Sequence, residues 1–264
     1  MLAIIRGAGD IASAIALRLH KCGVSVIMTE VEHPLTVRRT VAFSEAVRSG
    51  KTQVEGVVGI RAESADDALR RALEGVIPVL VDPECSCIWL EPDVLVDAIL
   101  AKRNVGTAID MAPIVIGIGP GFTAGDDCHA VVETMRGHTL GRVYYEGSAL
   151  PNTAVPGLVG GFAGERVLRA PNDGIFREVA SIRDHVEAGQ VVAYVDDAPV
   201  IATLTGTLRG LLAGGTRVTK GLKCGDIDPR DEVSHCETVS DKGLAVAGGV
   251  LEAILNLSDT LTKA

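Results

Sequence analysis

The hydrophobic and polar residues at the start of the chain are spaced as a strand, a helix and a second strand. An apolar run covers Leu2–Arg6, and after a glycine turn the apolar residues of Asp10–Lys21 recur at helical spacing. Residues 24–28 then return as a β-branched run that ends at Glu30. This order predicts a βαβ unit, whose crossover connection makes the two strands parallel.

The same alternation continues along the first half of the chain. We predict further strands over 54–60, Ile77–Val81 and Ile114–Ile118, and helices over Ala65–Leu73 and 92–102. The strands are near-continuous runs of Val, Ile and Leu, which is typical of a sheet covered by helices on both faces. The sequence therefore predicts an α/β fold in which residues 1–121 form a Rossmann-like, nucleotide-binding domain with a parallel sheet.

From about Ala170 the pattern changes to short β-like runs separated by Gly and Asp, and an internal repeat explains them. A shift of 32 residues superimposes Ala170 on Ala202, Gly174 on Gly206, Arg177 on Arg209, Val186 on Val218, Gly189 on Gly221 and Asp196 on Asp228. Two similar β-units predict a small, β-rich barrel-sandwich over residues 169–231. We interpret 122–168 as a connecting segment and 232–264 as a C-terminal helical segment, with helical spacing over 240–257.

Residues 186–192 resemble a strand of biotinyl and lipoyl domains, which share this two-unit architecture. Those domains carry a modified lysine on the hairpin that joins their halves. Here the hairpin is Asp196-Asp197-Ala198-Pro199, which contains no lysine. The resemblance therefore predicts a biotinyl- or lipoyl-like fold without a covalent cofactor.

The composition of the chain argues against nucleic acid and membranes as binding partners. The 264 residues include 34 acidic and 25 basic ones, and a formal net charge of −9 would repel a phosphate backbone, so we expect no nucleic acid partner. No run approaches the roughly 18 apolar residues of a membrane span, and the N-terminus does not match a secretion signal. The six cysteines are scattered, so we expect reduced thiols, a cytoplasmic location and no membrane partner. The oligomeric state stays open, and a homo-oligomer is one alternative.

The motif Gly7-x-Gly9-x-x-Ala12 follows the first predicted strand and opens the first predicted helix, and Glu30 lies 21 residues after Gly9. This is the dinucleotide fingerprint in its expected context. The first glycine permits a tight turn, and the second lets the backbone approach a pyrophosphate. The small third residue lets helix and strand pack closely, and the acidic residue accepts from ribose hydroxyls. Amides at the helix N-terminus then bind the anion.

Asp10 opposes this interpretation, because a carboxylate at the start of the helix would repel a pyrophosphate. It could instead cap the helix, as Asp does at such positions. Two interpretations of the motif therefore stay open. One is a site for a nucleotide or a pterin dinucleotide, and the other is a structural remnant of such a site.

Two further groups are candidates for ligand binding. Arg38 and Arg39 follow the second predicted strand, where planar guanidinium groups suit phosphate recognition, and a solvated helix face is the alternative. Gly119 and Gly121 lie in a glycine-rich loop after the fifth predicted strand. Ligands of open α/β sheets bind at this carboxyl edge, so we include both glycines among the candidate cofactor-binding residues.

The residues after this loop are of types that ligate metals, namely Asp126, Asp127, Cys128, His129 and Glu133. Their spacing matches no zinc pattern, so we favour hydrogen-bonding roles and expect no metal site. Cys85 and Cys87 form a C-x-C pair, for which inert thiols are favoured over a thiophilic metal site or a persulfide relay.

The segment 221–230 is dense in turn and charged residues. We interpret Asp226, Asp228 and Arg230 as partners in ion pairs that anchor the β-rich domain to the rest of the chain, and the lining of a ligand cleft between the domains is the alternative. No nucleophile elbow, histidine-based triad or P-loop is recognisable in the sequence. The sequence therefore assigns no catalytic residue.

Six blocks of the sequence carry a resemblance to a known family. They are residues 7–23, 38–47, 117–143, 169–176, 206–212 and 223–230. Taken in order, they resemble the selenium-dependent molybdenum hydroxylase accessory proteins of the YqeB type. The likeness runs nearly end to end, and its middle and C-terminal blocks are more specific than the dinucleotide fingerprint.

The resemblance implies a non-catalytic maturation role, related in concept to the XdhC and CoxI factors, with an apo molybdenum hydroxylase as protein partner. Combined with the glycine motif, it leads us to expect that the Rossmann cleft binds a molybdenum pterin dinucleotide or another nucleotide. An NAD(P)-dependent oxidoreductase is the alternative, although the sequence offers no convincing proton donor beside a nicotinamide. A third interpretation is a scaffold that recognises the apo-hydroxylase through its β-rich domain.

Overall fold

The computed structural model describes residues 1–155 and 157–258, and the chain divides into two compact units. Unit 1 comprises Met1–Pro34, Ala42–Thr153 and the chain from Val239 onward. Unit 2 comprises Leu35–Val41 and Ala154–Thr238. Residue 156 of the expected connecting segment and residues 259–264 of the expected C-terminal segment lie outside the described residues.

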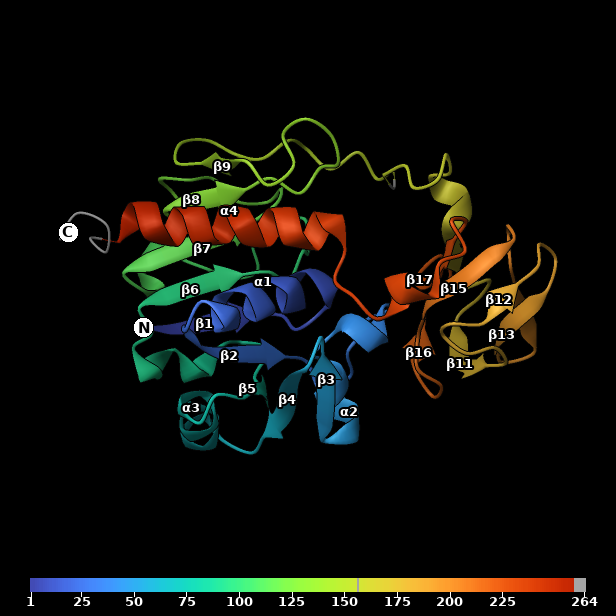
Figure 1. Cartoon of the computed structure of the whole chain (residues 1–264), viewed down its shortest axis with the longest axis horizontal. Coiled ribbons are helices and arrows are strands. Elements are labelled where there is room, and N and C mark those ends of the chain that lie inside the picture. The colour runs from blue at the N-terminus through green and yellow to red at the C-terminus, as the bar shows by residue number, and fades with distance from the viewer. Residues whose placement is uncertain (156, 259–264) are drawn as a thin grey trace. The chain divides into compact units, whose positions relative to one another are not determined.

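Unit 1 is built on a large mixed sheet, which has nine strands among the described residues (Figure 1). They are β1 (Leu2–Arg6), β2 (Ser25–Glu30), β3 (Lys51–Val54), β4 (Val57–Ala62), β5 (Ile77–Val81), β6 (Val94–Asp97), β7 (Ile114–Ile118), β8 (Ala130–Val132) and β9 (Val143–Tyr144). Their spatial order is β3-β4-β5-β2-β1-β6-β7-β8-β9. Neighbouring strands are parallel from β4 to β8, and β3 and β9 run antiparallel at the two edges.

The strand order reverses at β1. This strand pairs with β2 on one side and with β6 on the other, and both pairings are parallel. The carboxyl ends of these three strands therefore meet at one edge of the sheet. In open α/β sheets this edge, beside the strand where the order reverses, is where ligands bind.

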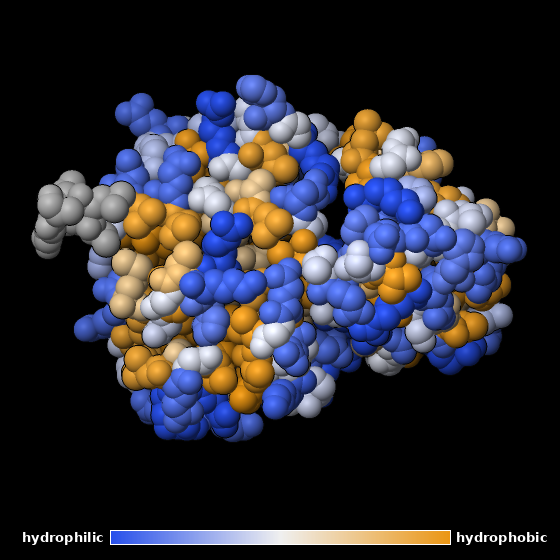
Figure 2. Space-filling model, in the orientation of Figure 1, coloured by the Kyte–Doolittle hydropathy of each residue, from blue (hydrophilic) through white to orange (hydrophobic). Residues whose placement is uncertain are grey.

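Helices α1 (Asp10–Lys21) and α4 (Asp241–Leu257) lie side by side on the sheet, and both begin at the same end of it (Figure 1). Helix α1 contacts β1 and β2, and α4 contacts β7, β8 and β9. A Cβ added at Gly243 would lie only 2.8 Å from the Cβ of Ala14, so the first turn of α4 packs closely on the second turn of α1. In the space-filling view hydrophobic residues reach the surface among hydrophilic ones (Figure 2), and Leu244 of α4 is one of the exposed apolar side chains.

The remaining helices of unit 1 are short. They are α2 (Glu45–Ser49), α3 (Ala65–Leu73) and the 3₁₀ helices η2 (Ser86–Leu90) and η3 (Ile109–Met111). Helix α3 contacts β2, β4 and β5, and its N-cap Ser64 accepts a hydrogen bond from the amide of Asp67. No described helix in the chain is long and apolar enough to cross a membrane.

Unit 2 contains two four-stranded sheets within the described residues. One has the order β10 (Val167–Arg169), β17 (Lys223–Asp228), β15 (Gly206–Leu211) and β12 (His185–Val186). The other has the order β14 (Ala198–Ile201), β13 (Val191–Val195), β11 (Gly174–Glu178) and β16 (Arg217–Val218). The 3₁₀ helices of unit 2 are η1 (Arg39–Val41), η4 (Gly164–Arg166) and η5 (Val233–Cys236).

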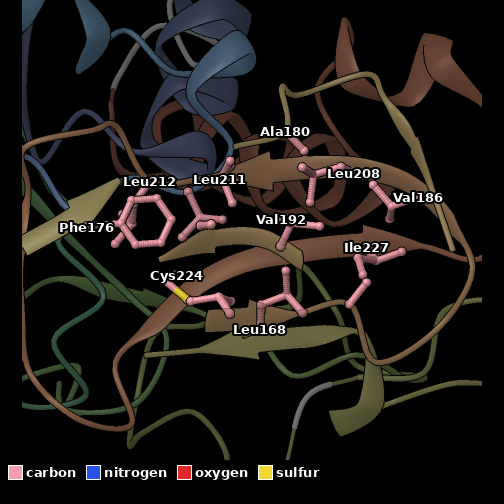
Figure 3. Packing of buried hydrophobic residues seen from close by; sticks show 14 of the residues in the cluster. Leu168, Phe176, Ala180, Val186, Val192, Leu208, Leu211, Leu212, Cys224 and Ile227 are labelled. Carbon is pink, nitrogen blue, oxygen red and sulfur yellow. The ribbon is translucent and has the colours of Figure 1, made fainter. Parts of the chain in front are cut away.

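The 32-residue repeat is visible in the strand pairing of unit 2. Strand β11 pairs with β13 and β16, and the equivalent strand β15 pairs with β17 and β12. The apolar side chains of these strands form one buried cluster, in which Phe176, Val192, Leu208 and Ile227 are fully buried (Figure 3). This cluster is the hydrophobic core of unit 2.

Most predicted elements of unit 1 lie where the spacing placed them, and two are corrected. The helix expected over 92–102 is wrong, because Val94–Asp97 forms the buried strand β6. The single strand expected over 54–60 is the hairpin of β3 and β4, joined by Glu55 and Gly56. Both turn residues have positive φ, 45° and 85°, which is the backbone conformation that a two-residue hairpin requires.

The predicted fold class is also wrong. We expected a Rossmann-like parallel sheet joined to a separate biotinyl- or lipoyl-like barrel-sandwich domain. The chain is instead a mixed α/β protein with a large sheet, because the hairpin of β3 and β4 and the pair of β8 and β9 add antiparallel strands at both edges. The biotinyl- or lipoyl-like assignment rested on the sequence of residues 186–192 and on the 32-residue repeat, and the solved structures reported below give it no support.

Candidate anion-binding site

The loop between β1 and α1 follows the carboxyl end of the first strand. Gly7 has a φ of +93°, and a Cβ at this position would lie 3.0 Å from the carbonyl oxygen of Ala98. Both the left-handed backbone and the close approach therefore require glycine. The amide of Gly7 donates to the carbonyl of Thr29 on β2 at 2.9 Å, so the loop is tied to β2 and packs against the exit of β6.

Helix α1 begins without a side-chain cap. Its N-cap is Gly9, and no side chain in the described part of the chain caps the helix there. By contrast, α3 is capped by Ser64 and α4 by Ser240. Asp10 lies inside the first turn of α1 and is not its N-cap. The amides of an uncapped first turn are donors that a bound anion can use.

Glu30 ends β2 and is bonded to the glycine loop. Its Oε2 accepts from the amide of Ala8 at 2.9 Å, and its Oε1 accepts from the amide of Val31 at 2.8 Å. Partial burial raises the pKa of the Glu30 carboxyl, and the two amide hydrogen bonds oppose that rise. Each oxygen keeps a lone pair that can accept from a hydroxyl group. Ala12, the third small residue of the motif, is buried against the sheet.

A buried ion pair lies beside this loop, at the carboxyl ends of β1 and β6. The Nη1 of Arg6 lies 3.3 Å from Oδ2 of Asp97, and the Oγ1 of Thr107 donates to the same oxygen at 2.6 Å. The other guanidinium nitrogen, Nη2, donates to the carbonyl of Val105 at 3.1 Å. All three side chains are fully buried, so the network holds the loop after β6 in place.

The two predicted loop glycines lie against neighbouring loops of unit 1. Gly119 has a φ of +79° and faces Thr134, whose Oγ1 would lie 2.6 Å from an added Cβ. Gly121 has a φ of +113° and faces the backbone of Arg103, also at 2.6 Å. The glycine-rich loop after β7 therefore packs between the segment after β8 and the segment after β6. These glycines shape the carboxyl edge through close packing.

Basic side chains that sequence reasoning missed lie near the start of α1. Burial lowers the pKa of Lys242, and the charges of Lys102 and Arg136 lower it further, whereas Asp10 and Glu133 act in the opposite direction. Partial desolvation also lowers the pKa of Lys102, although this residue is exposed. These charges interact because the tertiary fold brings together segments that are more than one hundred residues apart.

Arg38 and Arg39 belong to unit 2 and bond within it. The Nη2 of Arg38 donates to the carbonyls of His235 at 2.9 Å and Thr238 at 3.1 Å. The Nε of Arg39 donates to the carbonyl of Leu211 at 2.8 Å, and its Nη2 pairs with Glu178 at 2.6 Å. These hydrogen bonds tie both arginines to the backbone and to Glu178 of unit 2.

The residues after the glycine-rich loop make hydrogen bonds to the backbone. Asp127 accepts from the amide of Thr123 at 2.8 Å, and His129 accepts through Nδ1 from the amide of Val115 at 3.0 Å. Glu133 is fully buried and accepts from three backbone amides, those of Thr134, Met135 and Leu150. Within residues 1–155 and 157–258, no group of three or more His, Cys, Asp or Glu side chains could hold a metal ion.

Cys85 and Cys87 are buried at the start of η2. Asp82 accepts from the amides of Ser86 at 2.9 Å and Cys87 at 2.8 Å, which fixes the turn between the two thiols. A hydrogen bond from the Cys87 thiol lowers the pKa of Cys85 despite its burial, and the same bond raises the pKa of Cys87. The two thiols are therefore unequal, and solvent reaches neither of them.

The acidic residues of segment 221–230 form a buried ion-pair ladder in unit 2. Asp226 accepts from Arg166 at 2.5 Å and from Arg209 at 2.8 and 2.5 Å. Asp228 accepts from Arg209 at 3.1 Å and from Arg230 at 2.9 and 2.6 Å. The charges alternate in sign along the ladder, and the aspartates pair with arginines of unit 2 itself, whereas the sequence led us to expect ion pairs to the rest of the chain.

Comparison with known proteins gives one relative at the sequence level. No family model matches the chain. The curated protein described as uncharacterized protein YqeB of Escherichia coli (strain K12) is 52% identical over 264 residues. The match covers all of this chain and 49% of that protein, so the chain spans about half the length of the curated relative it matches.

Solved structures give only weak similarity. An aspartoacylase family protein from Mesorhizobium loti is 14% identical, with a TM-score of 0.27 over 86% of this chain and 84% of that one. A succinylglutamate desuccinylase/aspartoacylase from Rhodobacter sphaeroides is also 14% identical, with a TM-score of 0.23 over 85% of this chain and 86% of that one. At these scores the similarity assigns no activity to this chain.

These findings correct the functional expectation. The relative carries no assigned function, and the similar solved structures are not molybdenum hydroxylase accessory proteins. The expected membership of a selenium-dependent accessory family, related in role to XdhC and CoxI, is therefore wrong, as is the expected maturation role. The alternative of an NAD(P)-dependent oxidoreductase has no support either. The six sequence blocks identified a relative, but that relative is described as uncharacterized, so no function can be transferred from it to this chain.

Proposed function

We propose that unit 1 binds a small ligand that carries a phosphate group and a vicinal diol, the chemistry of a nucleotide, at the carboxyl edge of its sheet. The observation that carries the proposal is the hydrogen bond from the amide of Ala8 to Glu30 at 2.9 Å. It joins an acidic side chain at the end of β2 to the loop that precedes the uncapped helix α1. The proposal concerns binding alone and assigns no reaction.

The phosphate group would bind at the start of α1. Gly9 has no side chain, so a phosphate oxygen can approach the first-turn amides closely. The partial positive charge at a helix N-terminus favours an anion there, and the carboxylate of Asp10 opposes it. The positive charge of Lys242 interacts with Asp10 and therefore offsets part of the repulsion between the Asp10 carboxylate and a bound phosphate.

The diol would bind at Glu30. A carboxylate that already accepts one backbone hydrogen bond on each oxygen is held in a fixed orientation, and its remaining lone pairs suit two adjacent hydroxyl groups. A molybdenum pterin dinucleotide and a nicotinamide dinucleotide both carry a pyrophosphate and a ribose diol. We make the proposal for this class of ligand and not for one member of it.

Calorimetric titration with ADP and with 2′,3′-dideoxy-ADP tests both halves. We expect wild type to bind ADP about tenfold more tightly than the dideoxy compound, since hydrogen bonds to a carboxylate contribute about 1.5 kcal/mol or more. Glu30→Gln should bind the two nucleotides about equally. Gly9→Asp should lose both, because its carboxylate meets the phosphate.

Gly164→Asp is the matched control, since a side chain at that position in unit 2 would meet no neighbour within 4 Å. It should bind ADP like wild type. Equal affinity of wild type for ADP and 2′,3′-dideoxy-ADP would contradict the proposed binding of a diol at Glu30. Equal binding by Gly9→Asp and wild type would remove the phosphate position.

We also propose that the protein works in a reducing compartment, the cytoplasm. All six cysteines, each of which is among the described residues, are free thiols, and five are buried. Free, buried thiols are usual where glutathione and thioredoxin keep cysteines reduced. Fractionation of the native host, followed by thiol alkylation and intact-mass measurement, tests this. Recovery of an oxidised protein outside the cytoplasm would contradict it.

A further inference from the structure

Cys85 and Cys87 are two buried thiols that the proposed function does not use. Both belong to one hydrophobic core cluster of unit 1, and the residue between them, Ser86, is the first residue of the 3₁₀ helix η2. The backbone of a residue sets the distance between the Cα atoms on either side of it, which is about 5–5.5 Å for a helical residue. A disulfide needs about 4.4–6.8 Å between its two Cα atoms. The backbone therefore already brings Cys85 and Cys87 within disulfide reach.

The turn that carries the two thiols is held by one residue, Asp82. Its carboxylate oxygens accept from the amides of Ser86 at 2.9 Å and Cys87 at 2.8 Å. Its carbonyl oxygen accepts from the amide of Cys85 at 3.0 Å. These three bonds fix the backbone of the C-x-C segment, and a hydrogen bond joins the two thiols. The pair is therefore a preformed dithiol.

A buried cation lies beside this turn. The Nη2 of Arg6 donates to the carbonyl of Pro83, two residues before Cys85, at 3.4 Å. The Nε of Arg6 is buried and makes no hydrogen bond within the described residues. The hydrogen bond from Cys87 lowers the pKa of the Cys85 thiol, burial opposes that change, and the charge of Arg6 lowers the pKa further. The bond to Cys85 and burial raise the pKa of Cys87. Cys85 is therefore the better nucleophile of the two.

A reagent reaches the two thiols when η2 opens locally. The helix has five residues, and a 3₁₀ helix has poorer hydrogen-bond geometry than an α-helix. Its two caps, Cys85 and Glu91, have φ values of 56° and 53°, a left-handed backbone that is unfavourable for residues other than glycine. Opening relieves this strain. Ser86 and Trp89 of η2 are exposed, so the helix lies at the surface and opens without disrupting the buried strands.

We propose that Cys85 and Cys87 form a redox-active dithiol, which a hydroperoxide oxidises to an intramolecular disulfide. The inference is independent of the proposed ligand site. Cys85 acts as the attacking thiolate and Cys87 as the resolving thiol. A dithiol reductant returns the pair to its reduced form by thiol–disulfide exchange. Transient disulfides of this kind are compatible with a reducing compartment.

The oxidation takes place in two balanced steps. With hydrogen peroxide, the Cys85 sulfur bonds to one peroxide oxygen, the O–O bond breaks, and the departing hydroxide takes up a proton to become water. The Cys87 sulfur then attacks the sulfenic acid at Cys85, so that an S–S bond forms and the S–O bond breaks. The hydroxyl group leaves as a second water with the proton of Cys87. The two sulfurs together lose two electrons, which the peroxide gains.

Titration of the reduced whole protein with hydrogen peroxide, followed by alkylation and tryptic mapping, tests the site. Residues 72–102 form one tryptic peptide, and its cysteines are Cys85 and Cys87. We expect this peptide to lose both alkylatable thiols and the mass of two hydrogen atoms, and dithiothreitol to restore them. Cys22 is the exposed thiol of the chain. Oxidation of Cys22 with the peptide left reduced would overturn the proposal, since exposure alone would then determine reactivity.

Single variants test the two roles. In Cys87→Ser the sulfenic acid at Cys85 has no resolving thiol, so dimedone should label it. In Cys85→Ser the remaining Cys87 should stay an unlabelled thiol at the same peroxide concentration. Cys128→Ser is the matched control, because Cys128 is a buried thiol of the same core cluster, and this variant should form the disulfide at the wild-type rate. Equal labelling of the two single thiols, or no labelling of Cys85, would overturn the proposal.

Trp89 reports the reaction in the folded protein. It is the single tryptophan of the chain and lies in η2, two residues after Cys87. Its emission should shift at the rate at which the thiols are lost, return with dithiothreitol, and stay constant in Cys85→Ser. Oxidation of Cys128 in wild type at the same rate as the pair would show that peroxide reacts only with globally unfolded molecules, and that result would overturn the proposal.

Discussion

The buried ladder of unit 2 and the carboxyl edge of unit 1 both gather charge, and they treat it in opposite ways. In the ladder, guanidinium groups hold both oxygens of Asp226 and both oxygens of Asp228. At the edge, Lys102 and Lys242 have neighbours of like charge and no ion-pair partner among the described residues.

A structural charge cluster and a ligand-binding one differ in whether the fold itself supplies the counter-charges. Charged groups that already use their hydrogen-bonding capacity within the fold have no free donors or acceptors for a ligand. Removing one partner of such a buried pair leaves the other charge uncompensated, which destabilises the fold. Charges that destabilise the unliganded protein gain most when a counter-charge arrives. Fold stability should therefore respond most strongly to changes in the ladder, and ligand affinity to changes at the edge.

The largest expected effect follows from the loss of one ladder carboxylate. Asp226→Asn should lower the free energy of unfolding by about 3–5 kcal/mol, because the buried Arg166 would lose its counter-charge and Arg209 would keep only that of Asp228. Urea denaturation measures it. Asp231→Asn is the control, since that side chain is exposed and its replacement should change stability far less than Asp226→Asn does. A loss below about 1 kcal/mol for Asp226→Asn would show that the ladder does not depend on this charge.

A smaller effect is expected at the close contact between α4 and α1. Gly243→Ala should destabilise unit 1 by about 1–2 kcal/mol, because the new methyl group would lie 2.8 Å from the Cβ of Ala14. Gly248→Ala, on the same helix, would meet no atom within 4 Å and should stabilise by about 0.5–1 kcal/mol through helix propensity. The pair of variants is compared by urea denaturation. Equal changes in stability would contradict the close contact.

The elements of unit 1 were predictable from the sequence wherever periodicity was unambiguous. The bounds of α3 and of strands β1, β5 and β7 match the spacing of their apolar residues. Strand β6 was mistaken for a helix because a short, continuous apolar run fits both periods. The hairpin of β3 and β4 was missed because Glu55 is an uncommon residue for a left-handed turn position.

The site was predictable only in its local part. The glycine loop and Glu30 belong to one βαβ unit, so their spacing along the chain indicates that they meet. In the sequence, three strands of the large sheet and residues 154–238 of unit 2 lie between Lys102 and Lys242, so their spacing along the chain does not indicate that their charges interact. The position of Lys242 in the first turn of an apolar helix was the one local signal, and it has no unique meaning without the partner helix.

The smallest expected effect is a pH dependence that distinguishes the two regions. Burial raises the pKa of Glu30 above its usual 4.5, so the stability it contributes is present below 4.5 and lost as the pH rises through the folded value. Asp226 behaves oppositely. Burial raises its pKa, but Lys223, Arg209 and Arg166 outweigh burial and lower it below 3.8. Its contribution is present above 3.8 and lost as the pH falls through the folded value.

Glu30→Gln removes only the first of these dependences. Its free energy of unfolding, measured by urea denaturation from about pH 2 to pH 8, should rise relative to wild type as the pH increases. The acid-induced loss of stability due to Asp226 should persist unchanged in the variant, because the ladder lies in the other unit. Parallel pH profiles of variant and wild type would contradict the raised pKa of Glu30. They would also remove the physical basis for treating this carboxyl differently from the paired carboxylates of the ladder.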